Sequence, residues 1–302
     1  RNFFKQYRPF FLYAGFFSLF INLLLLAPAL YMLLAFDRVL TSRHGETLVL
    51  LTLLTVGALI VMMLLEMLRS RLLAGAAVAM DRRLGGRVLS SLLEGARQPG
   101  NIDNVHGLKD LGTLRTFLTG PGILSLFDAP WLPIYILVIF LFHPLMGAVA
   151  CVGAVSLFIL ALLNEKLTRK PLEELQKQSR RAGRFVDLSL RNAEAVNAMG
   201  MAGGVTEAWQ GANRKVLELQ LTSSQWASSI SAATKFMRQL VQVSMLGIGA
   251  WLVIGLDVSP GVMIAATILL GRALAPVETL IAGWRTLVEA RSAAHRLHDL
   301  LA

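Results

Sequence analysis

Charged side chains are scarce in this sequence. Asp, Glu, Lys and Arg make up 16% of its 302 residues, whereas soluble globular proteins carry about 25%. Hydrophobic residues make up 55%, and the mean hydropathy is +0.60. The deficit of charge excludes an ordinary soluble domain and indicates a membrane protein.

Clusters of reactive or metal-binding side chains are lacking as well. The single cysteine, Cys151, lies in an apolar run, so one chain can form no disulfide framework and a metal cluster is not expected. His295 and His298 form an H-x-x-H pair with no further ligand nearby, which fits a solvated helix end better than a metal site. The remaining histidines form no triad with acids or with Cys151. We therefore expect no catalytic or metal site in these residues.

The motif Gly-x-x-x-x-Gly-Lys-Ser/Thr, whose backbone cradles nucleotide phosphates, is also absent from the sequence. This chain alone is therefore expected neither to bind nor to hydrolyse ATP. It begins at Arg1 rather than Met, so we expect it to be trimmed. The first apolar run is longer than a signal-peptide core and lacks a small-residue cleavage site, so we interpret it as a retained span.

Long apolar runs are what the sequence does have. Six segments approach the roughly 20 apolar residues that a membrane helix needs. We predict an all-α membrane protein with spans at about 10–36, 47–68, 123–142, 145–163, 236–256 and 260–282.

Basic residues set the expected orientation of these spans. Lys and Arg outnumber Asp and Glu by 29 to 19. They gather in the N-terminal tail and in the stretches 69–115 and 164–215, whereas the links after spans three and five have none. By the positive-inside rule, both termini and both long loops are cytoplasmic. The same placement argues against nucleic acid as the partner of the basic charge.

The two long loops read as helical hairpins, at about 69–122 and 164–235. Apolar residues recur at helical spacing from Leu72 to Leu92, with charge on the opposite face. Breaks fall at 98–101 and at "NAMGMAGGV", 197–205. A helix rises about 1.5 Å per residue, so each hairpin should extend about 45 Å beyond the membrane.

This arrangement resembles the membrane domain of an ABC exporter. The segments 30–53, 114–147 and 271–301 are similar to the permease/ATPases of type I secretion, which export bacterial proteases, lipases and related proteins. The sequence Asp-Ala-Pro-Trp within "ILSLFDAPWLPIYILVIFLFHPLMG" is the most specific part, because generic ABC exporters lack it. The resemblance covers essentially the whole chain.

The resemblance implies a homodimer in the bacterial inner membrane that exports an unfolded polypeptide carrying a C-terminal signal. It also implies a membrane fusion protein, an outer-membrane channel and a nucleotide-binding domain, which is missing from this chain and would hold ATP and Mg. Each loop tip would form a coupling helix on that domain, near 99–107 and 199–209. The candidate coupling residues are Asn101, Asp103, Asn104, Met199, Gly200, Met201 and Gly203.

Two charges lie inside the predicted spans, where ionisable side chains are costly and commonly functional. Asp128 lies about 14 residues from the outer end of span three, and Arg272 about 12 residues from the outer end of span six. Because these depths agree within about one helical turn, we hypothesise that Asp128 and Arg272 pair or face one polar cavity. The alternative is a structural ion pair without a role in transport.

Pro130 and Pro133 follow Asp128 closely and remove two backbone donors, which predicts a bend in span three. Trp131, between them, either lines the polypeptide route or packs at a helix crossing. Together with Asp128, Arg272 and Arg38, these residues are our candidates for the translocation route or its gate. For Arg38, at the outer end of span one, anchoring of the helix end is the alternative.

Two basic residues, Lys235 and Arg238, begin span five. We expect them to extend toward the membrane surface, and Glu66 of span two could neutralise one of them.

Two other functions stay open at this point. An ABC exporter of lipid or drug would have a laterally open cavity lined mainly by apolar and aromatic residues. A membrane scaffold without transport would need neither intramembrane charge nor two matched hairpins. We expect the chain to be the membrane-spanning half of a polypeptide exporter.

Overall fold

The computed structural model describes residues 3–95 and 107–301. All regular structure in these residues is helical. The chain divides into two compact units, one made of residues 1–158 and 235–302 and the other of residues 159–234. We describe each unit by itself. In chain order the helices are α1 (Phe3–Leu24), α2 (Ala27–Leu34), the π-helix η1 (Ala35–Val39), α3 (Leu40–Ser42), α4 (Gly45–Gly95), α5 (Gly107–Thr119), α6 (Pro121–Asp128), the 3-10 helix η3 (Ala129–Trp131), α7 (Leu132–Phe142), α8 (Pro144–Arg191), α9 (Ala193–Ala198), α10 (Ala202–Ile254), α11 (Pro260–Ala282) and α12 (Trp284–Leu301).

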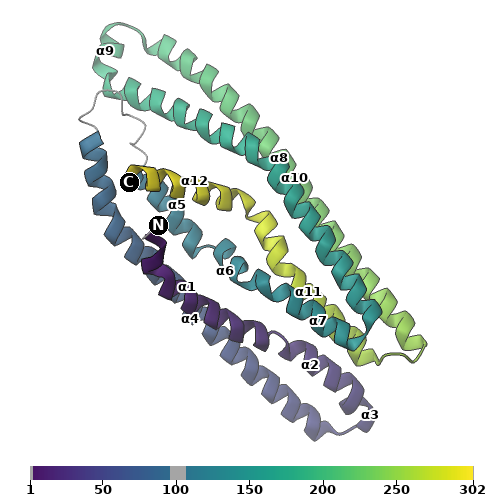
Figure 1. Ribbon diagram of the computed structural model, residues 1–302. Helices are drawn as coiled ribbons and strands as arrows, with labels where there is room; N and C mark the ends of the chain where they lie inside the picture. Colours follow the sequence, from purple (N-terminus) through teal and green to yellow (C-terminus); the bar gives the residue numbers. More distant parts are fainter. Residues whose placement is uncertain (1–2, 96–106, 302) are drawn as a thin grey trace. The chain divides into compact units, whose positions relative to one another are not determined.

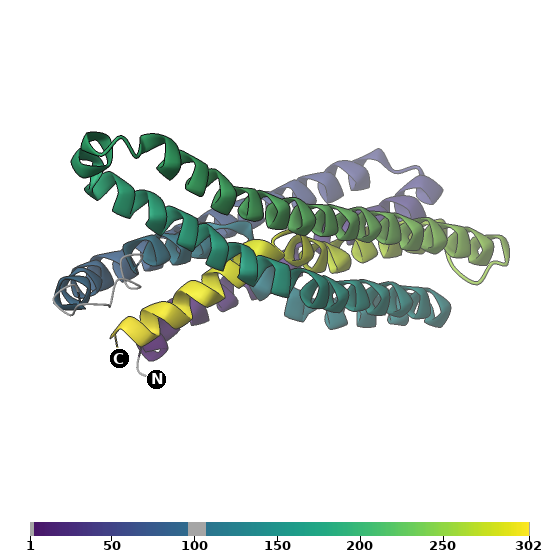
Figure 2. The ribbon, with the colours of Figure 1, turned by 90° about the horizontal axis from the view of Figure 1, so that it is seen from above.

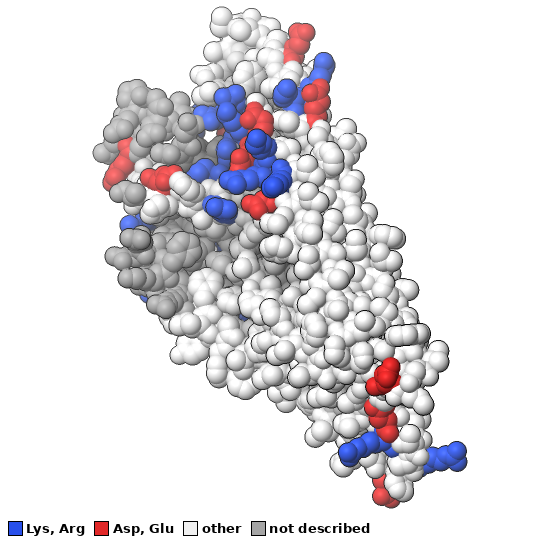
Figure 3. All heavy atoms as spheres, turned by 45° about the vertical axis from the view of Figure 1, so that its right-hand side comes forward, with Lys and Arg blue, Asp and Glu red and all other residues white. Residues whose placement is uncertain are grey.

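Six helical segments in the described residues are long and apolar enough to cross a membrane, which confirms the predicted fold class. They lie within Pro9–Ser42, Gly45–Glu94, Pro121–Phe142, Pro144–Arg191, Ala202–Ile254 and Pro260–Ala282. On the face in Figure 3, charged side chains gather toward two ends, with a broad uncharged area between them. That distribution fits a chain whose middle lies in hydrocarbon.

The first candidate span is interrupted. Helix α1 ends at Leu24. After two intervening residues α2 begins at Ala27, with Pro28 in its first turn. Proline is well placed there, because the first helical N–H groups have no partner inside a helix anyway. The chain then passes through the π-helical turn η1, which carries Asp37 and Arg38. Such turns are rare and often lie at functional sites.

In the larger unit, α4 packs along α1 and α5 (Figure 1), while α11 contacts α2, α6 and α7. Spans three (α6 and α7) and six (α11) are therefore neighbours. The buried face of α11 is made of small and medium side chains, which allow close approach of neighbouring helices. They include Ala265, Ala266, Leu269, Leu270, Ala273 and Leu274.

Glycines mark two further close helix contacts in this unit. A Cβ on Gly153 of α8 would lie 2.5 Å from Cγ1 of Val241 on α10. A Cβ on Gly249 of α10 would lie 2.6 Å from Cγ of Met263 on α11. Both distances are shorter than carbon atoms tolerate, so these backbones approach as closely as they do because the side chains are absent.

The end of the chain is also helical and packed. Helix α12 lies along α5 and also contacts α4, and Figures 1 and 2 show it near the beginning of α1. Its buried face consists of Val288, Ala290, Ala293 and Leu297.

The second unit is a helical hairpin made of the later part of α8, the short α9 and the first part of α10. Leu172 is fully buried, and Thr168 donates a 3.0 Å hydrogen bond to Asn164 within the buried face. At the turn, the amide of Met201 donates to the carbonyl of Val196, and that of Gly200 donates to that of Asn197. With Gly200 at φ +67°, this is a Schellman cap, which ends α9.

Candidate functional site

Span three changes its helical form at the two prolines. Helix α6 ends at Asp128, one turn of 3-10 helix follows, and α7 starts at Leu132. Pro130 lies in the first turn of η3, and Pro133 lies in the first turn of α7. The helix changes its form where the bend was predicted, with Trp131 half-buried between two exposed prolines; the bend itself stays a prediction.

One oxygen of the Asp128 carboxylate is the centre of a polar network between helices. Nη1 of Arg69, on α4, donates to Oδ1 of Asp128 at 2.8 Å. Nδ2 of Asn22, on α1, donates to the same oxygen at 2.9 Å, and the hydroxyl of Ser18 donates to it as well. Arg69 Nη1 also donates to the Ser18 hydroxyl at 2.7 Å. The carboxylate thus joins α1, α4 and α6 through charge-assisted bonds, which are stronger than neutral ones.

Tyr135 extends this network to α7. Its hydroxyl lies 2.9 Å from the carbonyl oxygen of Asn22 and 3.0 Å from Oδ1 of the same residue. Ser18, Asn22 and Tyr135 are almost fully buried, and the side chain of Arg69 is 5% exposed. The side chain of Asp128 is 20% exposed. We call Ser18, Asn22, Arg69, Asp128 and Tyr135 the polar network.

The hypothesis that Asp128 pairs with Arg272 is wrong for this structure, because the ion pair is made with Arg69. Arg272 is exposed on α11 and makes no ion pair within residues 3–95 and 107–301. Agreement in depth did not say which face of each helix carries the charge. The alternative, that Asp128 and Arg272 face one polar cavity, stays a prediction.

Arg69 was not among the predicted site residues, because it directly follows the predicted span two and reads as one of the basic residues of the loop. Ser18 and Asn22 were missed too. They are two polar residues four apart in an apolar span, hence on one helix face, and that spacing was the available signal.

Arg238 also has a different partner from the one expected. Its Nε lies 3.0 Å from Oε2 of Glu278 on α11, an ion pair whose N–H is not aligned for a hydrogen bond. Glu66, the expected partner, is exposed and makes no ion pair within the described residues. Lys235 is exposed, in accord with the predicted extension toward the membrane surface.

Asp37 holds the N-terminal end of α11, which is the predicted outer end. The Ser259 hydroxyl, at the N-cap of α11, donates to Oδ2 of Asp37, and the amide of Gly261 donates to Oδ1 at 3.0 Å. A carboxylate is favourable here because the first amides of a helix carry partial positive charge. A Cβ on Gly261 would lie 2.5 Å from Oδ1, so only glycine allows this approach. We call Asp37, Ser259 and Gly261 the outer clasp. The neighbouring Arg38 is exposed.

Comparison with known proteins identifies the family of this chain. Residues 11–276 match the ABC transporter transmembrane region. The chain belongs to that family. The membrane-domain architecture inferred from the resemblance is thus confirmed, and the polar network and the outer clasp are features of an ABC transporter membrane region.

The chain is similar to proteins of type I secretion, as expected from the resemblance. It is 37% identical to the type I secretion system ATP-binding protein PrsD of Rhizobium meliloti (strain 1021), over 98% of this chain and 51% of PrsD. It is 26% identical to the leukotoxin translocation ATP-binding protein LktB of Mannheimia haemolytica and to the leukotoxin export ATP-binding protein LtxB of Aggregatibacter actinomycetemcomitans, over 98% of this chain and 42% of each. The chain therefore spans about half the length of the curated relatives it matches.

In this ABC transporter membrane region, the second predicted coupling tip is an exposed apolar turn. Met199 is 72% exposed and Met201 50%, on either side of the left-handed Gly200. The break is narrower than predicted, since Gly203 already lies in the first turn of α10. The residues proposed for the first tip, Asn101, Asp103 and Asn104, lie outside the described residues.

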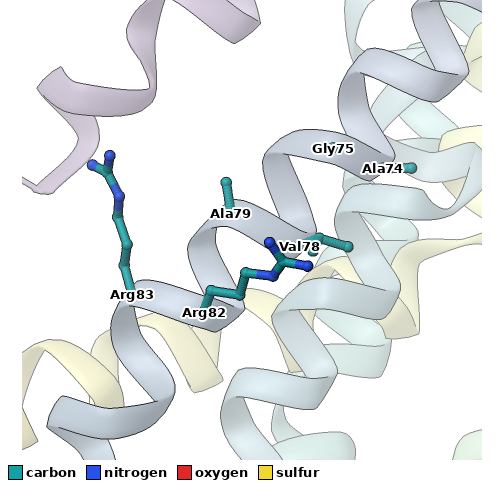
Figure 4. A pocket seen from close by; sticks show the side chains of 6 residues that line it. All are labelled: Ala74, Gly75, Val78, Ala79, Arg82 and Arg83. Atoms are coloured by element: carbon teal, nitrogen blue, oxygen red, sulfur yellow. The ribbon is translucent and has the colours of Figure 1, made fainter.

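A groove of about 490 Å³ runs along α4 beyond its apolar span. Small side chains line one part of it, and Arg82 and Arg83 leave the helix in different directions at its other end (Figure 4). The lining residues are Ala74, Gly75, Val78, Ala79, Arg82 and Arg83. Nothing in this lining could act as a nucleophile or a general base. In the part of the chain that the structure describes, no three His, Cys, Asp or Glu side chains gather as metal ligands.

Proposed function

We propose that this chain is the membrane-spanning half of an ATP-driven exporter that secretes unfolded polypeptides by the type I pathway. The observation that carries the proposal is its continuous similarity, over 98% of its length, to proteins named for type I secretion and toxin export. These relatives are named ATP-binding proteins and are about twice as long as the matched region. A nucleotide-binding domain, with its ATP and Mg, would supply the chemistry.

The polar network is the proposed gate element. It joins α1, α4 and α6 within the apolar part of the chain, at the helix interruption that follows Asp128. Proline-marked interruptions in membrane helices bend more readily than continuous helix. Exchange of the Arg69–Asp128 pair between two arrangements would let span three move relative to spans one and two. Trp131, Pro130, Pro133, Arg272 and Arg38 are the proposed lining of the route.

The hairpin tips are the proposed contacts with the nucleotide-binding domain. The exposed Met199 and Met201 suit insertion into an apolar groove, since methionine adapts to irregular surfaces. Gly200 fixes the sharp turn that presents them. Gly203 and, at the first tip, Asn101, Asp103 and Asn104 complete the proposed set.

The assembly follows from the same resemblance. We propose a homodimer in the bacterial inner membrane, with both termini and both hairpins, at about 69–122 and 164–235, in the cytoplasm. The basic residues of those stretches support this orientation. A membrane fusion protein and an outer-membrane channel would complete the route out of the cell.

The test uses the full-length gene product reconstituted in liposomes. ATPase activity is measured with a polypeptide that carries a C-terminal secretion signal, with the same polypeptide lacking the signal, and with lipid or drug. We expect stimulation only by the polypeptide with the signal. Strong stimulation by lipid or drug, with none by polypeptide, would identify a lipid or drug exporter. No stimulation by any of them, together with no ATPase activity, would favour a scaffold.

A further inference from the structure

Helix α12, which ends the described chain, is attached to α5 by a partly buried ion pair. Nε of Arg296 donates to Oδ2 of Asp110 at 2.8 Å, and Nη2 donates to Oδ1, so both carboxylate oxygens are engaged. The side chain of Asp110 is 11% exposed and that of Arg296 37%. A bidentate pair fixes direction as well as distance, because the planar guanidinium must face the carboxylate squarely.

An apolar core contains Leu111 and Leu297, the sequence neighbours of the two charged residues. Its buried members come from α4, α5 and α12, and include Val88, Leu111 and Leu297. Phe10 and Phe11 of α1 pack against the same core. Four helices of one chain thus share a core that includes the last turns of α12.

Gly107 shows how closely α12 approaches the hairpin formed by α4 and α5. A Cβ at this first residue of α5 would lie 2.9 Å from Cδ2 of Leu300 and 2.9 Å from Cγ1 of Val88. The end of α12 therefore lies against the hairpin and does not behave as a loose linker.

We propose that α12 and the α4–α5 hairpin form one rigid lever, latched by the Asp110–Arg296 pair. Motion of the proposed nucleotide-binding domain then reaches α4 and α5 through α12, by a path that bypasses both hairpin tips. Since α4 also carries Arg69, the lever ends at the polar network. Only the effect of the lever on export rests on the proposed function, because the Asp110–Arg296 pair is a property of this chain.

The experiment compares variants of the full-length protein in lipid nanodiscs and liposomes. Arg296→Asp places two carboxylates against each other and should detach α12. We expect its α12 amides to exchange hydrogen roughly tenfold faster or more, since a buried charge has lost its partner. Polypeptide exported per ATP hydrolysed should fall while ATPase activity persists. The double variant Asp110→Arg/Arg296→Asp should restore both quantities.

A matched control lies on the same helix. Arg285 and Glu289 form an exposed ion pair at 2.9 Å within α12, without contact to α5 through that pair. Glu289→Gln removes it and should change neither hydrogen exchange nor export per ATP, because exposed pairs contribute little.

Three results would overturn the lever. They are unchanged exchange in Arg296→Asp, faster exchange without loss of export per ATP, and failure of the double variant to restore both. If the wild-type protein exports no polypeptide, the proposed function fails instead. The exchange measurement, made without cargo, still decides whether the latch exists.

Discussion

Replacing Asp128 by Asn should destabilise the protein more than replacing its partner Arg69 by Met. Asp128→Asn preserves the shape of the side chain and can still accept hydrogen bonds from Ser18 and Asn22. However, it leaves the guanidinium of Arg69 charged, 5% exposed and without a counter-charge. Removing one member of a buried pair in this way costs about 3–5 kcal/mol.

Arg69→Met leaves the carboxylate of Asp128 unpaired, but in a less buried environment than that of Arg69. Asp128 is 20% exposed and keeps two donors, the Ser18 hydroxyl and Nδ2 of Asn22. The loss is then mainly one charge-assisted hydrogen bond, about 1.5–3 kcal/mol. The order of the two single variants therefore follows from the unequal burial of the two charges.

The double variant Arg69→Met/Asp128→Asn separates these effects. It removes both charges, so no unpaired charge stays buried, and we expect it to be more stable than Asp128→Asn alone. The assay is the free energy of unfolding in mixed micelles, titrated with denaturing detergent. Asp257→Asn, at an exposed carboxylate in the turn between α10 and α11, is the matched control and should hardly change the free energy of unfolding.

One outcome would refute this reasoning. If the double variant loses as much stability as the sum of the two single variants, the charges are independent and the pair does not hold the helices together. Asp128→Asn with the stability of the Asp257→Asn control would lead to the same conclusion.

Three further predictions concern backbone geometry, each measured by the same unfolding titration. Gly153→Leu should destabilise the protein by about 1–3 kcal/mol through overpacking against Val241. The control Gly57→Ala, where a Cβ meets nothing within 4 Å, should be neutral or slightly stabilising. Equal effects of the two substitutions would contradict the close contact between α8 and α10. Gly261→Ala should disrupt the outer clasp and cost more than the Gly57 control, and no loss would show that α11 can shift freely. Leu256→Asn should stabilise by about 0.5–1 kcal/mol, because Leu256 holds a left-handed φ of +63° that Asn tolerates better, and a loss of stability would argue against strain there.

Much of the fold could be predicted from the sequence, because the membrane simplifies the problem. A span of about 20 apolar residues without charge has few alternatives to a helix. The same holds for the interruption at Pro130 and Pro133, since proline lacks the donor that a continuous helix needs. The π-helical turn at Asp37 had no such signal, because its register depends on the contact with α11.

The partner of the partly buried charge Asp128 could not be predicted from the sequence. Arg272 lies at a predicted depth that suits Asp128, whereas Arg69 follows the predicted end of span two. The sequence does not tell how each helix is rotated about its axis. The structure shows that α4 presents Arg69 toward α1 and α6, where Ser18 and Asn22 complete the site. Selecting the correct arginine required the packing of three helices, which is a tertiary property.

The polar contacts of α11 lie toward its two ends. At its outer end, Asp37 holds Gly261, and toward its inner end Glu278 pairs with Arg238. Between these two points α11 contributes no member to the polar network, and Pro276 lacks the N–H that would bond to the carbonyl of residue 272. A helix that is held near both ends bends most readily where a backbone hydrogen bond is missing. Arg272 lies at that position and is exposed. Bending of α11 at this position would therefore move Arg272 while the Arg69–Asp128 pair stays closed.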